Sequence, residues 1–263
     1  MPLIMQLSKV QVHAKEYNAS DCWGALKAFT SARIALGRTG TSVPLKEALA
    51  FKLSHAHARD AVYSVLNLEH LHLNLLSFKL PVFHLVSKVK NRTEYLQRPD
   101  LGRQMDSELV SELKDFTYGS FDIAIIIADG LSATAVNAHA VPLLNLLIPK
   151  LESAGLSLAP ICLAEQARVA IGDEVGELLK AKISLILIGE RPGLSSTNSL
   201  SAYLTFGPKP GLTDEARNCV SNIRTDGLPS GLAADKIFYL IKEALRRKLS
   251  GVKLKEQINI IEC

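Results

Sequence analysis

The sequence predicts an α/β fold in which a mostly parallel sheet has helices on both faces and follows a helical N-terminal region. Two observations predict it. Apolar runs such as FDIAIIIA and ISLILIG lack the alternation of a half-exposed strand, which indicates strands buried on both faces. Segments with helical periodicity separate these runs, and strands that alternate with helices are typical of parallel, Rossmann-like sheets.

Helices and loops make up the predicted N-terminal region, which we place at residues 1–105. A helix is expected at Asp21–Phe29, and a longer one at Leu45–Leu66, where apolar residues recur at the spacing of one helical face. Between them, GRTGTSVP has the glycines and proline of a loop. The polar segment 87–103 contains Arg-Pro-Asp and Leu-Gly and is predicted to be another loop.

The predicted sheet lies in residues 106–263. Its elements, in chain order, are a strand within Phe121–Ala133, a helix at 134–155, an extended segment at 156–169, a short helix at 172–182, a strand at 183–189, an extended segment at 200–211 and a closing helix at 233–251. Acidic residues begin the short helix and basic residues fill the last turns of the closing helix, as the helix dipole favours.

Composition excludes several classes of protein. The 263 residues are 48% apolar, enough to form a core, and the net charge of +4 is not gathered in a basic stripe with interleaved aromatic residues, as nucleic-acid binding would favour. No apolar run reaches the ~20 residues of a membrane span. The four cysteines are far apart without a C-x-x-C pair, so we predict reduced thiols, no metal site and a soluble cytoplasmic protein.

Polar residues follow the predicted strands, and ligands of a parallel sheet bind at the carboxyl ends of its strands. We therefore expect four segments to meet at this edge: ADGLSA (128–133), EQARVAIGDE (165–174), GERPGLSS (189–196) and FGPKPG (206–211). None of the motifs G-x-G-x-x-G, G-x-x-x-x-G-K-[ST], G-x-S-x-G and H-E-x-x-H is present, which argues against a stand-alone dehydrogenase, kinase, hydrolase or zinc enzyme.

Single residues at this edge leave alternatives open. Asp129 with Gly130 could hold a ligand hydroxyl or form a turn that caps the next helix. Glu190 and Arg191 could bind a ligand or pair with each other to orient a loop. Cys219 could be a small apolar filler. The histidine pairs of SHAH and EHLH are two residues apart, and such residues diverge on a helix, so we interpret them as surface residues.

Eight segments together resemble the small subunit of ethanolamine ammonia-lyase. They occur in the family's order from about Ser31 to Lys255: SARIALGRTGT, LSHAHARDAV, YLQRPDLGR, IADGLSA, ARVAIGDEVGELL, LILIGERPGLSS, RNCVSNIR and RRKLSGVKLK. Of these, GERPGL and CVSNIR are the most specific. The resemblance covers most of the chain.

The resemblance implies a subunit of an adenosylcobalamin-dependent radical enzyme that converts ethanolamine to acetaldehyde and ammonia. It implies that the corrinoid lies between this chain and a large subunit, a β/α barrel that carries the substrate site. The helical region 1–105 would dock the large subunit, and residues 106–263 would bind the cobalamin. Homolysis of the cobalt–carbon bond would make the radical that abstracts hydrogen from ethanolamine, with the protein supplying binding and orientation.

The family pattern implies corrinoid contacts for three residues, and we add four neighbours. The three are Val169, Glu190 and Cys219, and the added neighbours are Asp129, Ser132, Arg191 and Ser221. No catalytic residue is expected in this chain. It has no Asp-x-His-x-x-Gly motif, so the cofactor's own benzimidazole is expected to stay the lower ligand of cobalt.

Two other functions stay open at this point. One is a free-standing α/β enzyme that binds a nucleotide at the same edge, and the other is a structural partner that binds no cofactor. The location is expected to be the cytoplasm, or a bacterial microcompartment, into which the N-terminal region can direct relatives of this system.

Overall fold

The structure, a computed structural model, describes residues 23–116 and 119–255. The chain divides into two compact units, residues 1–54 and residues 55–263. The division at Ser54 differs from the functional boundary expected at residue 105. That boundary, between a docking region and a cofactor-binding region, stays a prediction.

The described part of the first unit contains helical elements and an extended loop. The 3-10 helix η1 (Gly24–Phe29) covers most of the helix predicted at Asp21–Phe29, and Asp21 and Cys22 lie outside the described residues. Helix α1 (Leu45–Val62) confirms the second predicted helix, ends at Val62 instead of Leu66, and continues into the second unit.

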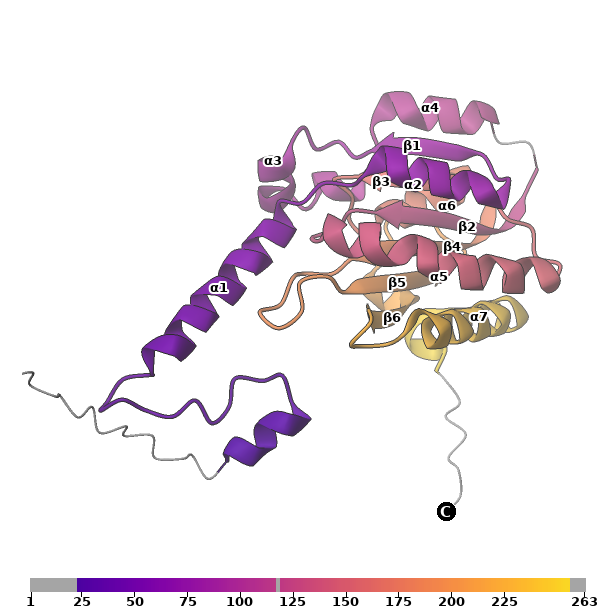
Figure 1. The fold of residues 1–263 in the computed structure, drawn as a ribbon. Coiled ribbons are helices and arrows are strands. Elements are labelled where there is room, and N and C mark those ends of the chain that lie inside the picture. The colour runs from indigo at the N-terminus through magenta and orange to yellow at the C-terminus, as the bar shows by residue number, and fades with distance from the viewer. Residues whose placement is uncertain (1–22, 117–118, 256–263) are drawn as a thin grey trace, which may run out of the picture. The chain divides into compact units, whose positions relative to one another are not determined.

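The second unit contains a mixed sheet of six strands in the order β1-β3-β2-β4-β5-β6 (Figure 1). Strands β1 to β4 run parallel to one another, β5 is antiparallel to β4, and β6 is antiparallel to β5. The prediction of parallel strands therefore holds for the first four, and the last two make the sheet mixed. The strands are β1 (Val82–Val86), β2 (Phe121–Ala128), β3 (Ile161–Glu165), β4 (Ala181–Gly189), β5 (Leu200–Phe206) and β6 (Arg217–Ile223).

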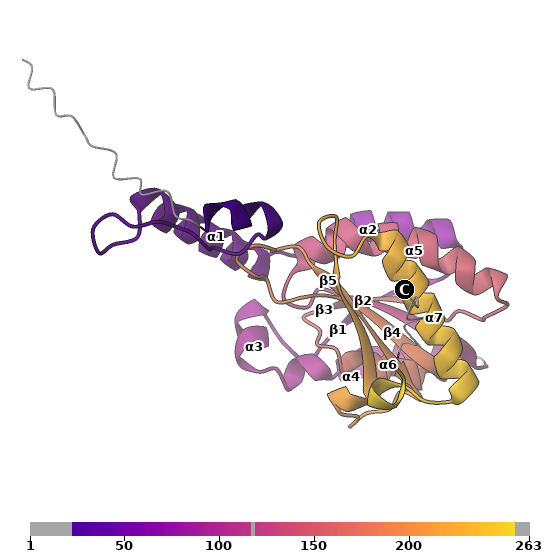
Figure 2. The same cartoon turned by 90° about the horizontal axis from the view of Figure 1, so that it is seen from below.

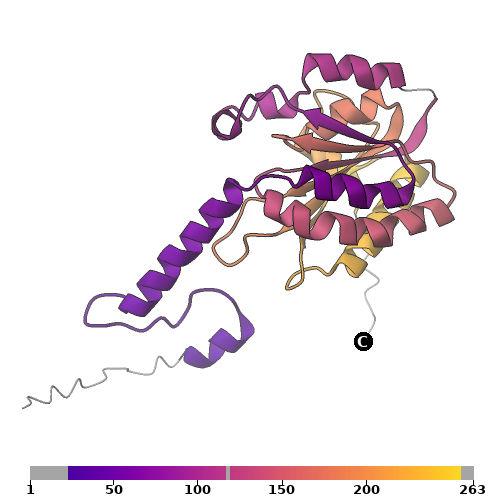
Figure 3. The same ribbon diagram turned by 45° about the horizontal axis from the view of Figure 1, so that its top comes forward.

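Helices cover both faces of this sheet (Figures 2 and 3). On one face, Ile123 and Ile125 of β2 join a core with α2, α5 and α7. On the other face, Ala124 and Ile126 join a core with α4 and α6. Since successive side chains of a strand point to opposite faces, burial on both explains why residues 123–128 of β2 are all apolar. The helices are α2 (Leu68–Leu75), α3 (Arg92–Gln97), α4 (Ser107–Phe116), α5 (Ala133–Ser153), α6 (Ile171–Leu178) and α7 (Ser230–Arg247), and the 3-10 helices are η2 (Leu76–Phe78), η3 (Leu101–Arg103), η4 (Asp214–Ala216) and η5 (Gly251–Lys253).

The prediction of a loop at 87–103 is wrong, because this segment contains α3 and η3. The Asn91 side chain accepts a hydrogen bond from the Glu94 N–H (3.0 Å) and thereby caps α3. The Arg-Pro-Asp breaker marks the end of this helix. The region 1–105, expected to be helical, also supplies β1, which pairs with β3 at the edge of the sheet.

The segment FGPKPG leaves the sheet at the edge opposite to the predicted one. Because β5 is antiparallel to β4, Phe206 lies across from Ile183, near the start of β4. Strand β6 then runs back, so that Ile223 pairs with Leu200, which pairs with Gly189. The segment CVSNIR, instead of FGPKPG, therefore reaches the carboxyl edge of the parallel strands.

Gly130 and Gly189 allow the ends of β2 and β4 to approach each other closely. Gly130 has a φ of +57°, and a Cβ there would overlap the backbone of Gly189. A Cβ on Gly189 would overlap the carbonyl oxygen of Ser132 and lie 2.6 Å from that of Asp129. The Leu131 N–H donates to the Gly189 carbonyl (3.0 Å). Only glycine fits at both positions, since backbone atoms fill the space.

Gly189→Ala is expected to destabilise the fold by about 2 kcal/mol or more, because its methyl group must displace backbone atoms. Gly231→Ala is the control: it lies in the first turn of α7, where none of the described atoms comes within 4 Å of an added Cβ. The control should be neutral or stabilise by up to about 1 kcal/mol. Equal free energies of unfolding in urea for the two variants would contradict the close approach.

Candidate functional site

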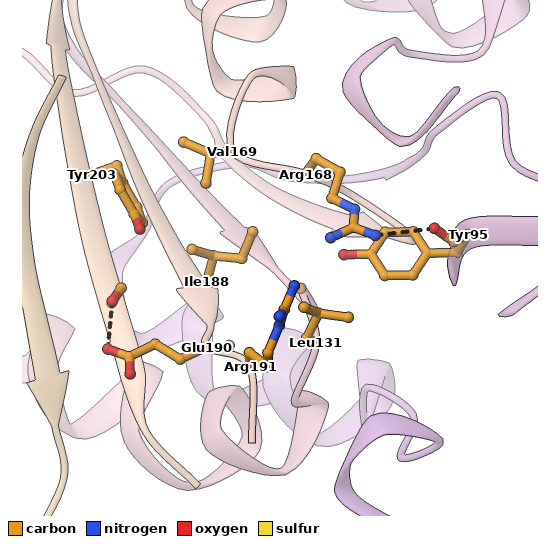
Figure 4. A pocket seen from close by; sticks show the side chains of 11 residues that line it. Tyr95, Leu131, Arg168, Val169, Ile188, Glu190, Arg191 and Tyr203 are labelled. Carbon is orange, nitrogen blue, oxygen red and sulfur yellow. Dashed lines mark hydrogen bonds between the residues drawn. The ribbon is translucent and has the colours of Figure 1, made fainter. Parts of the chain in front are cut away.

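The loops after β2, β3 and β4 meet at the carboxyl edge of the sheet and surround a hollow of ≈ 150 Å³ (Figure 4). Three of the four segments predicted to converge here do so. Residues of α3 and β5 complete the wall. The lining residues are Tyr95, Gly130, Leu131, Arg168, Val169, Ile188, Gly189, Glu190, Arg191, Ser201 and Tyr203.

Glu190 is held by two donors and keeps one carboxylate oxygen available. Its Oε1 accepts hydrogen bonds from Ser201 Oγ (2.6 Å) and from the Asn222 N–H (2.7 Å). Within the described residues, no hydrogen bond reaches Oε2. The alternative of an ion pair with Arg191 is not observed, and the two side chains point in different directions (Figure 4). Glu190 can therefore accept a further hydrogen bond from a ligand.

Two guanidinium groups contact the Tyr95 ring on the opposite side of the hollow, and Arg168 is the one that lines it. The fully buried Tyr95 ring has its centroid 4.5 Å from Arg92 and 4.2 Å from Arg168. The Tyr95 hydroxyl donates to the Ala167 carbonyl (3.0 Å), and Arg168 Nη2 donates to the Tyr95 carbonyl (3.1 Å). Burial raises the pKa of the Tyr95 phenol, so it stays a neutral donor. The stack fixes the loop that carries Val169.

Tyr203 and Cys219 form an uncharged side of the site. They face each other across the antiparallel pair β5–β6, and the Cys219 thiol is exposed. Burial raises the pKa of Tyr203 to about 12. Desolvation of the sulfur also raises the pKa of Cys219, against the opposing effect of hydrogen bonds with Tyr203 and Ser201. Both groups are therefore neutral near pH 7 and suited to packing or weak hydrogen bonding.

Asp129 is buried behind the hollow and holds the neighbouring loop. Its carboxylate accepts hydrogen bonds from the N–H groups of Gln166 (3.0 Å) and Ala167 (3.0 Å) and pairs with Arg92 Nη1 (3.1 Å). It does not cap α5, because Ser132 takes that place and accepts from the Ala135 N–H. Burial raises the pKa of Asp129 to about 6, against the lowering by Arg92 and the N–H groups.

The structure brings only some of the seven predicted residues to the hollow. Val169, Glu190 and Arg191 line it, and Cys219 contacts two lining residues, Tyr203 and Ser201. The remaining three lie elsewhere: Asp129 is buried, Ser132 is buried with its Oγ donating to the Thr197 carbonyl (2.8 Å), and Ser221 is exposed on β6 outside the lining. Their contacts with a cofactor stay a prediction.

Sequence reasoning missed four polar or aromatic residues of the lining. They are Tyr95, Arg168, Ser201 and Tyr203. Tyr95 and Arg168 were within reach, since both belong to segments that resemble the family, YLQRPDLGR and ARVAIGDE. Ser201 and Tyr203 depend on the antiparallel direction of β5, which local sequence does not specify.

A second hollow, of ≈ 750 Å³, lies on the other side of Arg168 and Val169. The loop after β5 returns to it, and Pro210 contributes to its wall. Arg217 lines this hollow and forms a buried ion pair with Asp173, which lies in the first turn of α6. Asp173 is one of the acidic residues that the dipole of this helix favours at its start. Its ion pair with Arg217 also anchors β6 to α6.

Metal and membrane sites are not found in the parts of the chain that the structure describes. Residues 23–116 and 119–255 contain no group of three or more metal-binding side chains. The closest histidine pair there is His72 Nδ1 and His84 Nε2, which are 3.1 Å apart in a hydrogen bond. None of the described helices combines the length and apolarity needed to cross a bilayer.

Fold and site together define an α/β protein with a carboxylate, guanidinium groups and apolar side chains around a hollow at one edge of a mixed sheet. Comparison with known proteins gives the family. Residues 20–255 match the ethanolamine ammonia-lyase light chain family. The chain therefore belongs to this family, as its motifs indicated.

Individual relatives support the same family assignment. The chain is 52% identical over 241 residues to the ethanolamine ammonia-lyase small subunit of Azotobacter vinelandii, covering 90% of this chain and 89% of that protein. It is 48% identical over 251 residues to the small subunit of Pseudomonas aeruginosa, covering 94% and 92%. For the Pseudomonas putida small subunit, the identity is 48% over 241 residues, with coverage of 90% and 89%.

Asp129→Asn is expected to change how stability depends on pH. The pKa of about 6 in the folded chain lies above the ~3.9 of an ordinary Asp, so the folded state binds more protons between these values. The contribution of this carboxyl to the free energy of unfolding therefore falls as pH rises from about 4 to about 6. In urea unfolding, the stability of wild type relative to Asp129→Asn should fall by about 2 kcal/mol across this window. If the stability of wild type relative to Asp129→Asn instead rises with pH, the effect of Arg92 and the N–H groups on the pKa of Asp129 outweighs that of burial.

Proposed function

We propose that this chain binds adenosylcobalamin at the carboxyl edge of its sheet, together with the large subunit of ethanolamine ammonia-lyase. The complex converts ethanolamine to acetaldehyde and ammonia. One observation carries the proposal: Val169 and Glu190, implied by the family resemblance, line one hollow, and Cys219 contacts its wall. These residues come from the first half of β6 and from the loops after β3 and β4, so their convergence is a property of the fold.

The chemistry of the donors and acceptors fits a corrinoid. The periphery of a corrinoid carries primary carboxamides, each with an N–H donor and a carbonyl acceptor. The available Oε2 of Glu190 complements the donor, and the exposed guanidinium of Arg191 complements the acceptor. Ile188, Leu131 and Val169 offer apolar contact to the ring.

The size of the hollow supports a two-chain site. Its ≈ 150 Å³ accommodates one edge group and not a corrin ring. The ring would therefore lie over the edge of the sheet, with its other face exposed unless a second protein covers it. The large subunit fills this role, and closing the site between two chains also excludes water from reactive chemistry.

The residues of this chain bind and orient the cofactor. Adenosylcobalamin, when bound, supplies the radical chemistry. Glu190 is fixed by Ser201 and Asn222 before any ligand arrives, which lowers the entropic cost of binding.

Acetaldehyde should form from ethanolamine only when this chain, the large subunit and adenosylcobalamin are all present. The measurement is a coupled acetaldehyde assay of the complete mixture and of each mixture that lacks one component. Inactivity of the complete mixture with a competent large subunit would contradict the proposal. Activity of this chain alone with a nucleotide would favour a free-standing enzyme.

Glu190→Gln is expected to weaken adenosylcobalamin binding by the complex about tenfold or more, since a charge-assisted hydrogen bond contributes about 1.5–3 kcal/mol. Glutamine can keep Oε1 as the acceptor for Ser201 and Asn222, while Oε2 becomes an NH₂ donor. The substitution thus tests the available oxygen without removing the internal bonds. Equilibrium dialysis measures the affinity, and Glu177→Gln, exposed on α6, is the matched control. Equal affinities for both variants would remove Glu190 Oε2 from the site.

Helix α1 carries a stripe of exposed leucines that suits a protein partner. Leu45, Leu49 and Leu53 recur every fourth residue and therefore share one helical face, and they are 73%, 55% and 57% exposed. An isolated helix of this length is marginal in water, so an uncovered apolar stripe indicates a docking surface. We assign this leucine stripe to the large subunit, the partner that the small-subunit family implies.

The double variant Leu49→Glu/Leu53→Glu should weaken association with the large subunit at least tenfold, because two buried leucines contribute about 1.5–3 kcal/mol each. Sedimentation velocity of the mixed subunits measures the association. Ser54→Glu, one residue past the stripe and turned away from it, is the control. Unimpaired association of the double variant would show that the stripe lies outside the interface.

A further inference from the structure

A buried charged pair connects three segments behind the proposed cofactor site. Arg92 begins α3, Asp129 follows β2, and Gln166 follows β3. Arg92 Nη1 donates to Asp129 Oδ2 (3.1 Å) and to Gln166 Oε1 (3.4 Å). Arg92 Nε donates to the carbonyl of Val62, the last residue of α1 (2.7 Å). One guanidinium thus fixes the end of a helix relative to two loops of the sheet edge.

The Asp129 carboxylate determines the shape of the loop after β3. Gln166 has a φ of +53°, which a residue with a Cβ rarely adopts without support. Consecutive backbone N–H groups with one left-handed residue form a concave site for an anion, and the Asp129 carboxylate occupies it. When a neutral carboxamide replaces the carboxylate, one of its two acceptor oxygens becomes an NH₂ donor, so one of the two N–H groups loses its acceptor and the bend loses part of its support.

The bend directly precedes the residues that face the hollow. Arg168 and Val169 follow it, and the Arg168 N–H donates to the Gly102 carbonyl (2.7 Å) only in this arrangement of the chain. Asp129 also precedes Gly130, whose contact with Gly189 places the start of the Glu190 loop. Asp129 therefore holds the loop that carries Val169 through its carboxylate and adjoins the start of the Glu190 loop through Gly130, although its side chain is only 6% exposed.

We propose that Asp129 and Arg92 are positioning residues for the corrinoid, acting through the bend at Gln166 and not by contact with the cofactor. This inference rests on the proposed function. Asp129 was expected among the contacting neighbours, and its three protein partners assign it this other role. The pair keeps Val169 and Glu190 at a fixed separation before the large subunit closes the site.

The test uses the complete complex with Asp129→Asn and Arg92→Met. Adenosylcobalamin should bind about tenfold more weakly to each variant complex, a size typical of residues that support a binding shell. Arg92→Met keeps both backbone hydrogen bonds of Asp129. It therefore still tests the positioning role if Asp129→Asn does not fold. The double variant should lose little more than either single variant, because the two residues act as one unit.

A control separates positioning from general loss of stability. Leu147→Ala creates a cavity in the middle of α5, and its leucine is fully buried and outside the hollow. It should lower the urea midpoint at least as much as Arg92→Met while leaving cofactor affinity within about twofold. Hydrogen exchange gives a second readout: the Gln166 and Ala167 amides should exchange faster in Arg92→Met, with the β4 amides unchanged.

The outcomes separate the two proposals. Wild-type complex that binds no adenosylcobalamin would overturn the proposed function and this inference with it. If the wild-type complex binds adenosylcobalamin and both substitutions leave its affinity unchanged, only the positioning role is overturned. The same holds if Leu147→Ala lowers the affinity equally. Selective loss in Asp129→Asn and Arg92→Met, with faster exchange at the bend, supports it.

Discussion

The close contact between the ends of β2 and β4 is the constraint on which the candidate site depends. Gly130 and Gly189 bring backbone against backbone, so the loops that follow start from fixed positions. Asp129 lies one residue before the first glycine and Glu190 one residue after the second. A rigid edge built from main chain leaves the side chains of both loops available for other partners. The hollow therefore has a defined shape before any ligand binds.

The direction of β5 determines which segments reach this edge. The sequence indicates that 200–206 is an apolar strand, but an apolar strand has the same local pattern in either direction. The loop at 190–199 decides the direction of β5. It is long enough to return the chain antiparallel to β4 and too short for the helical crossover that a parallel strand would need. For the same reason β6 could not be predicted from composition. Its buried residues Arg217, Val220 and Ile223 lie three positions apart and do not follow the alternation of a regular strand, in keeping with the irregular register between β5 and β6.

The family motifs predicted only part of the candidate site. Val169, Glu190 and Arg191 line the hollow, and all three lie in segments recognised through the family resemblance. Asp129 and Ser132 were equally polar and equally close to a strand end, yet they bond inward. Local sequence does not distinguish a side chain that faces a ligand from one that holds a loop, because that depends on which neighbouring strand supplies the N–H groups. Tyr95 is the opposite case, because it lines the hollow although the sequence did not single it out. Its position depends on the packing of α3 against a loop that is distant in the sequence.

The protonation of the lining groups defines what this edge can contribute. The Tyr203 phenol and the Cys219 thiol have raised pKa values and stay neutral near pH 7, so neither is a ready base or nucleophile. Glu190 already accepts two hydrogen bonds, which fix its orientation. Fixed charges and neutral donors bind and orient a ligand without taking protons from it. Such an edge suits the role we propose for this chain, which is to bind and orient a cofactor.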